Sequence, residues 1–182
     1  MERQDAERTI LEVERVRRDT RHALNPVWFG NLAFGLFFAG TVILGIAGAG
    51  ADVTSLYWLL AGALTVGVVV RHYARHEREL GAQSPVLDGS TAVLLAMLAG
   101  ILAANLLTDG LASAVVPLYV AALGIVVLGL VLHDTIEVAA GVNAALWATV
   151  VAAVDPGEPG LWSNLGIAVI LVCAGVAGRR WA

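Results

Sequence analysis

Long apolar runs that contain no acidic or basic residue dominate the chain, and short charged segments separate them. A helix needs about 20 apolar residues to cross the hydrocarbon core of a membrane. Helical structure is required there, because lipid offers no partner to backbone N–H and C=O groups. The uncharged runs cover residues 23–51, 53–70, 89–108, 110–132, 138–154 and 159–178. They predict an all-α fold with six transmembrane helices at about 27–49, 54–74, 89–107, 111–132, 135–154 and 160–178.

The charges give this pattern an orientation. All 11 basic residues are arginine, and they fall before the first run, between the second and third, or after the last. In the loops expected on the other side, the only charged residues are acidic, namely Asp52, Asp109, Asp155 and Glu158. Cytoplasmic loops are rich in Lys and Arg, so the positive-inside rule predicts three hairpins with both termini cytoplasmic. The expected location is the cell (plasma or inner) membrane, with multiple passes.

Composition supports a lipid environment. Hydrophobic residues make up 58% of the chain and charged residues only 14%, whereas soluble domains are about one-quarter charged. The lipid bilayer is therefore the first expected partner. Residues 1–24 are predicted to form a charged helix that is cytoplasmic or interfacial, and residues 25–182 to form the membrane domain. Acidic residues nearly match arginines along the N-terminal segment, so a nucleic-acid partner is not expected.

Small residues at four-residue spacing predict where the helices pack closely. Membrane helices associate mainly through such smooth faces, because lipid tails are as apolar as leucine. We expect the third and fifth spans to lie at the centre of the bundle, or the fifth at a subunit interface. The two ridges are Ala92, Ala96, Gly100 and Ala104, and Ala140, Ala144, Ala148 and Ala152.

Four asparagines are the strongest polar groups expected within the spans. Asn31 and Asn143 lie about five residues from the cytoplasmic boundary, and Asn105 and Asn164 lie at a similar depth from the outer one. Two paired layers are therefore plausible. One interpretation is interhelical hydrogen bonding, worth about 1 kcal/mol for each bond. The other is a polar lining for a solute path, to which Trp147 in the middle of its span would contribute.

The remaining candidate functional residues lie at the expected cytoplasmic ends of the helices, here called the inner rim. Residues 71–78 are expected to continue the second helix into water, which places His72 and His76 one turn apart, a spacing that can bind a metal. A third ligand at a specific spacing is missing, so a solvated helix end is preferred and no metal site is predicted. Asp134 and Glu137 fit a capping box at the start of the fifth span. The alternative is a protonatable cluster formed by His133, Asp134 and Glu137 at the inner mouth of a path.

These patterns limit the function. The sequence contains no nucleotide-binding loop, nucleophile triad or zinc-ligand constellation, so no catalytic or cofactor-binding residue and no cofactor is predicted. Near the membrane midplane we expect no ionisable residue of the kind used by charge-coupled transporters. The first hypothesis is a non-enzymatic membrane subunit that forms a homo-oligomer or assembles with another membrane protein. The alternative is a small-solute transporter or channel without an ionisable midplane site.

Overall fold

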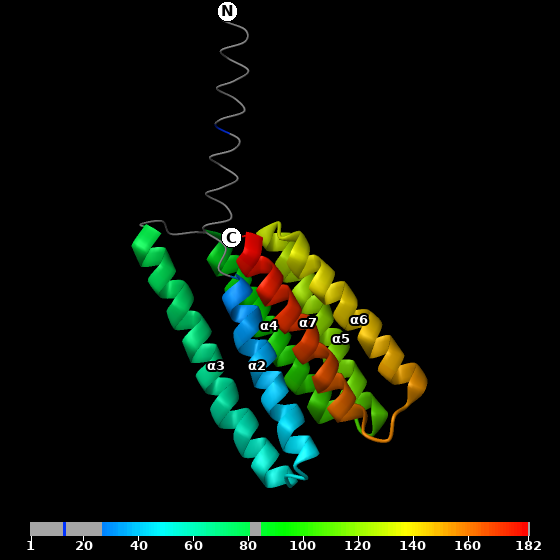
Figure 1. Cartoon of the computed structure of the whole chain (residues 1–182). Coiled ribbons are helices and arrows are strands. Elements are labelled where there is room, and N and C mark those ends of the chain that lie inside the picture. Colours follow the sequence, from blue (N-terminus) through cyan, green and yellow to red (C-terminus); the bar gives the residue numbers. More distant parts are fainter. Residues whose placement is uncertain (1–12, 14–26, 81–84, 182) are drawn as a thin grey trace, which may run out of the picture.

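The computed structural model describes residue 13, residues 27–80 and residues 85–181, and these described residues form six helices and no strand (Figure 1). The helix predicted for residues 1–24 lies outside the described residues, apart from Val13, which is helical. The six helices are α2 (Val27–Ile46), α3 (Ala51–Leu80), α4 (Pro85–Leu107), α5 (Leu111–Leu132), α6 (Thr135–Val154) and α7 (Pro159–Trp181).

The helix boundaries follow the local sequence. Helices α5 and α6 have the bounds that the apolar runs predict, and α3 continues through its arginine-rich segment to Leu80. Helix α2 ends three residues early, before Gly48, which has a φ of 68° that favours glycine. His133 and Asp155 take left-handed conformations directly after α5 and α6, and their backbone N–H groups bond back to those helices.

Five of the helices are long and apolar enough to cross a membrane, which makes this a multi-pass membrane protein by length and composition. They are α2, α5, α6, residues Asp52–Arg75 of α3 and residues Pro159–Arg180 of α7. Helix α4 contributes a shorter apolar helix, Ala92–Ile101, within the residues described. Many large apolar side chains lie on the outside, including Leu36, Leu60 and Leu106, as expected for helices that face lipid.

The helices alternate in direction, so the starts of α2 and α6 lie at the same end of the bundle as the ends of α3, α5 and α7 (Figure 1). We call this the arginine end, because Arg78, Arg179 and Arg180 lie in the last turns of α3 and α7. The opposite end, here the acidic end, holds Asp52 in the first turn of α3 and the loop between α6 and α7. The most extensive contacts join α2 to α7 and α5 to α6, and α3 packs more loosely on α2 at one edge.

Two helix contacts depend on glycine. A Cβ added to Gly129 of α5 would lie 2.6 Å from the backbone N of Val138, and one added to Gly141 of α6 would lie 2.7 Å from the backbone N of Val126. The two glycines thus let the α5 and α6 backbones touch. Gly175 of α7 has the same role against α2, since its Cβ would lie 2.9 Å from the carbonyl O of Trp28.

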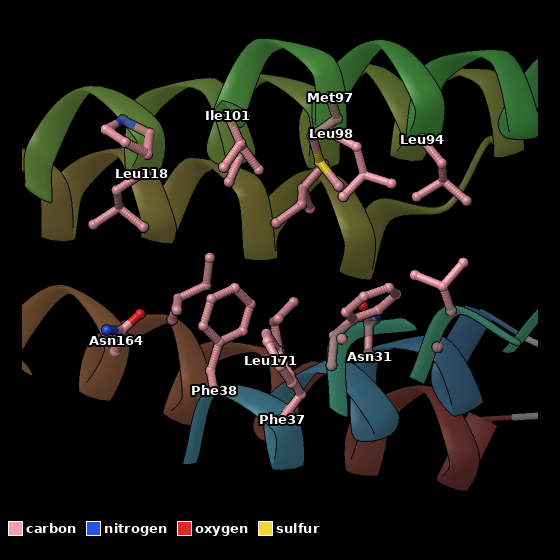
Figure 2. Close-up of a pocket in the computed structure, with 18 of the residues that line it drawn as sticks. Asn31, Phe37, Phe38, Leu94, Met97, Leu98, Ile101, Leu118, Asn164 and Leu171 are labelled. Carbon is pink, nitrogen blue, oxygen red and sulfur yellow. The ribbon is translucent and has the colours of Figure 1, made fainter. Parts of the chain in front are cut away.

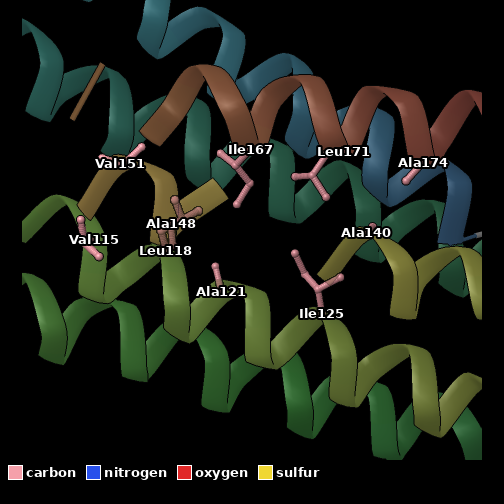
Figure 3. Packing of buried hydrophobic residues seen from close by; sticks show 10 residues of the cluster. All are labelled: Val115, Leu118, Ala121, Ile125, Ala140, Ala148, Val151, Ile167, Leu171 and Ala174. Carbon is pink, nitrogen blue, oxygen red and sulfur yellow. The ribbon is translucent and has the colours of Figure 1, made fainter. Parts of the chain in front are cut away.

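The ridge predicted on α6 lies largely inside the bundle. Ala140, Ala144 and Ala148 are buried between α5 and α7, whereas Ala152 is exposed. The buried apolar cluster combines α5, α6 and α7, with Ile125 facing Ala140 and Leu171 (Figure 3).

The prediction that α4 lies at the centre is wrong for the single chain. Helix α4 packs on α5, and Ala92 and Ala96 are exposed, while Ala104 is buried and Gly100 is half-buried. A four-residue step turns by about 40° around a helix of 3.6 residues per turn. Over three steps the ridge therefore leaves the contact face, which explains why only its C-terminal part touches α5.

Candidate functional site

A cavity of about 1330 Å³ separates α2, α3 and α7 from α4 and α5. Its walls are mainly apolar: Phe37 and Phe38 of α2 and Leu171 of α7 face Met97 and Ile101 of α4 across the space (Figure 2). The long axis has a polar group toward each end, since Asn31 and Asn164 lie on opposite sides of the phenylalanines (Figure 2). The cavity can therefore hold a molecule with an apolar body and polar ends.

The most buried polar contact in the cavity wall joins two helices near the arginine end. Asn31, in the second turn of α2, donates its Nδ2–H to Oε2 of Glu137 in the first turn of α6, at 2.6 Å. Glu137 is 2% exposed and Asn31 is 7% exposed. A carboxyl group buried to this degree normally has to be hydrogen-bonded. Among the described residues Glu137 has one such bond, and its donor is neutral.

The turn between α5 and α6 directs Glu137 inward. The Asp134 side chain accepts hydrogen bonds from the backbone N–H groups of Ile136 (2.9 Å) and Glu137 (3.3 Å), as an N-cap does. The cap starts α6 at Thr135, and the close approach of Val138 to Gly129 fixes the rotation of its first turn. The Glu137 side chain therefore points at α2 and does not fold back on Asp134.

Tyr73 of α3 adds a hydroxyl to this part of the cavity. A Cβ added to Gly30, the residue before Asn31, would lie 2.7 Å from the Tyr73 hydroxyl, so a larger residue there would displace the phenol. Tyr73, His133 and Glu137 all line the cavity. The arginine end of the cavity thus collects side chains from α2, α3, the α5–α6 turn and α6.

At the acidic end, Ser163 of α7 is 6% exposed and its Oγ has no hydrogen-bond partner among the residues that the structure describes. Ser163 and its neighbour Asn164 both line the cavity. Trp147 does not line it. Its Nε1–H donates to the carbonyl O of Trp162 at 2.9 Å, and its ring covers Gly166, so it joins α6 to α7. The role of Trp147 in this structure is therefore interhelical.

Two sequence interpretations of the polar residues need correction. Asn143 does not form a layer with Asn31, because it is exposed and donates to the carbonyl O of Ala139 in its own helix, at 2.8 Å. Glu137 does not complete a capping box, because its side chain bonds to Asn31. The Asn105 side chain lies outside the described part, so the outer pair stays a prediction.

One member of the histidine pair on α3, His72, contacts aromatic side chains. The His72 ring stacks on Phe29 with centroids 4.0 Å apart, and Trp28 lies edge-on to it at 6.3 Å. The His76 side chain lies outside the described residues. Among the side chains that are described, no three His, Cys, Asp or Glu residues gather as a metal site would require.

Sequence reasoning missed Tyr73, Ser163 and the aromatic wall as parts of one site. One signal was available for Glu137: with Gly141, Ala144 and Ala148 it forms a stripe at steps of four, three and four residues, the spacing of one helix face. A carboxylate on the face of a small-residue ridge is directed into the bundle. No protein-family model, curated protein or solved structure matches this chain.

Proposed function

We propose that the chain is a six-span protein of the cell membrane with both termini in the cytoplasm. Helix α4 has 23 residues, about 34 Å of helix at 1.5 Å per residue, enough for a hydrocarbon core about 30 Å thick. The arginines of α3 and α7 gather at one end of the bundle. One of them, Arg179, has its Cζ 5.7 Å from the ring centroid of Trp28 at the start of α2. A positive end of this kind favours the cytoplasmic side.

Single-cysteine labelling tests the orientation. In a Cys173→Ser background, Glu158→Cys in the α6–α7 loop should react with a membrane-impermeant maleimide in intact cells. Arg78→Cys at the exposed end of α3 should react only after the membrane is permeabilised. The reverse labelling pattern would place both termini outside.

We further propose that the protein is a non-enzymatic transporter or channel for a small solute that occupies the interhelical cavity. The observation that carries this proposal is the cavity itself, with a mainly apolar wall and polar residues at both ends. Small-molecule sites combine apolar walls with a few polar groups that set orientation, and in bundles they lie between helices. Glu137 sits in the first turn of α6 rather than near its middle, so the proposal needs no ionisable midplane site.

A bulky side chain in the cavity tests this role. Ala63 of α3 lines the cavity, and Ala63→Trp should reduce binding of Nile red, a neutral apolar probe, by at least about tenfold because the indole occupies the same space. The adjacent Leu64 is 68% exposed and does not line the cavity, so Leu64→Trp is the matched control and should bind normally. Equal binding by both variants, or no saturable binding by the wild type, would contradict a solute site.

A second candidate function is a membrane subunit that self-associates or assembles with another membrane protein. It is favoured by the exposed small residues Ala92 and Ala96 on α4, which offer a smooth face that α5 does not use.

If α4 forms such an interface, native mass spectrometry in mild detergent should find oligomers for the wild type. Ala96→Leu should shift them to monomers because the larger side chain separates the backbones. Leu95→Ala, at an exposed position beside it, is the control. A monomer at all concentrations would exclude self-association through this face.

A further inference from the structure

We propose that the cavity selects lipophilic cations, with the positive charge held beside the Glu137 carboxylate and the apolar body among the phenylalanines of α2. This inference rests on the proposed function of the cavity as a solute site, and it names the chemical class of the solute. Three observations carry it: the partner of Glu137, the aromatic wall and the unpartnered hydroxyl of Ser163.

Among the described residues, the hydrogen-bond partner of Glu137 is neutral and does not compensate a negative charge on the carboxyl group. The Asn31 amide satisfies one acceptor position of the carboxylate but carries no positive charge. A buried carboxylate is costly without a counter-charge, so a cation beside it recovers part of that cost. An anion would meet repulsion in the same place. The arginine end of the cavity therefore discriminates by the sign of the ligand's charge.

The aromatic side chains in the wall of the same cavity suit an organic cation. Phe34, Phe37, Phe38, Trp58 and Tyr73 line the cavity. Aromatic faces attract cations through their quadrupole, and this attraction grows where water is excluded. An apolar cation loses little hydration on entering such a space, unlike a small metal ion. The site therefore favours a large cation with its charge spread over an apolar body.

The aromatic wall is ordered before a ligand arrives. The Phe37 ring stacks on Tyr57 at 5.4 Å and contacts Trp58 edge-on at 4.9 Å. The Tyr57 hydroxyl donates to the carbonyl O of Phe37 at 2.7 Å, which ties α3 to α2. Pre-ordered side chains lose less entropy when a ligand binds.

Ser163 indicates how far the ligand extends. Its buried Oγ lines the acidic end of the cavity, and a hydroxyl without a partner is unfavourable in an apolar setting. A ligand that reaches from Glu137 to Ser163 would supply the missing hydrogen bond. The volume of about 1330 Å³ is large enough for a drug-sized molecule.

Two probes of matched shape and opposite charge test the proposal. Full-length protein in a zwitterionic detergent is titrated with tetraphenylphosphonium, a cation, and with tetraphenylborate, an anion, and Nile red serves as the neutral probe. We expect saturable one-to-one binding of the cation, at least tenfold tighter than that of the anion. Glu137→Gln should weaken cation binding at least tenfold, and much more than it weakens Nile red binding. Glu158→Gln, which alters an exposed carboxylate in the α6–α7 loop, should leave all three affinities unchanged.

The outcomes distinguish failure of the proposed cation site from failure of the proposed solute site. If Nile red binds but the wild type does not prefer the cation over the anion, the cation site is wrong and the solute site stands. The same holds if Glu137→Gln keeps its preference for the cation. If no probe binds saturably, the proposed function fails as well. The comparison of cation with anion uses only the wild type, so it decides the question even if Glu137→Gln does not fold.

Discussion

Gly141→Leu is expected to prevent the bundle from assembling. At Gly141 the first added carbon would lie 2.7 Å from the backbone N of Val126 and 2.8 Å from the carbonyl O of Ala122. These are backbone atoms of α5, so they cannot rotate away as a side chain would, and α5 and α6 would have to separate. Overpacking a core costs about 1–3 kcal/mol when side chains can adjust. We expect a loss of at least about 3 kcal/mol here, seen as low yield of monodisperse protein and a lower melting temperature in detergent.

Two variants serve as controls. Gly67→Leu introduces the same side chain on α3, where an added Cβ would meet nothing within 4 Å, and Leu123→Ala alters a side chain on α5 that is 66% exposed. Both should express and melt close to the wild type. Ala148→Leu should resemble Gly141→Leu, because Ala148 is 0% exposed. Similar yields for Gly141→Leu and Gly67→Leu would show that the α5–α6 contact is not required for folding.

The helices could be predicted because charge and apolarity decide the environment of each segment. Helix α5 lies in an uncharged run bounded by Asp109 and the His133–Asp134 pair, and α6 lies between that pair and Asp155 with one acidic residue, Glu137, in its first turn. A charge left in hydrocarbon is costly. Their bounds follow from those residues alone. The position of α4 could not be derived in the same way. A small-residue ridge shows that a close neighbour is tolerated, but not which helix provides it.

The site was harder to predict because it depends on the rotation of one helix about its axis. At the third position of α6, the Glu137 side chain can fold back on the N-cap or point into the bundle, and the local sequence is compatible with both conformations. The contact between Gly129 and Val138 selects the second, and it joins residues of two different helices. Asn31 and Glu137 lie near the starts of α2 and α6, at the same end of the bundle, which makes the contact possible. The hydrogen bond between Asn31 and Glu137 depends on how the helices pack, so the sequence alone does not predict it.

The coupling between Asn31 and Glu137 gives the second large effect that we expect. Asn31→Leu removes the hydrogen bond from a carboxyl group that is 2% exposed and should destabilise the protein by about 1–3 kcal/mol, or more if the group stays charged. Glu137→Leu alone should also cost stability, since the Asn31 amide then loses its acceptor. The double variant should be less destabilised than the sum of the singles by at least about 1 kcal/mol, because leucines at both positions leave no polar group unpaired. The free energy of unfolding, measured by denaturant titration in detergent, gives this coupling energy.

Glu137→Gln is the control for this cycle, because its side-chain oxygen can still accept the bond from Asn31 and its volume is nearly unchanged. Its stability should be close to that of the wild type, since it removes a charge from an apolar setting and keeps the bond from Asn31. If the amide variant is at least as stable as the wild type, folding does not explain why this position holds a buried carboxyl group. A coupling energy near zero would mean that Asn31 and Glu137 do not depend on each other. A large coupling energy with a stable Glu137→Gln variant would assign the Asn31 amide to holding the helices together and would show that the charge of Glu137 is not required for folding.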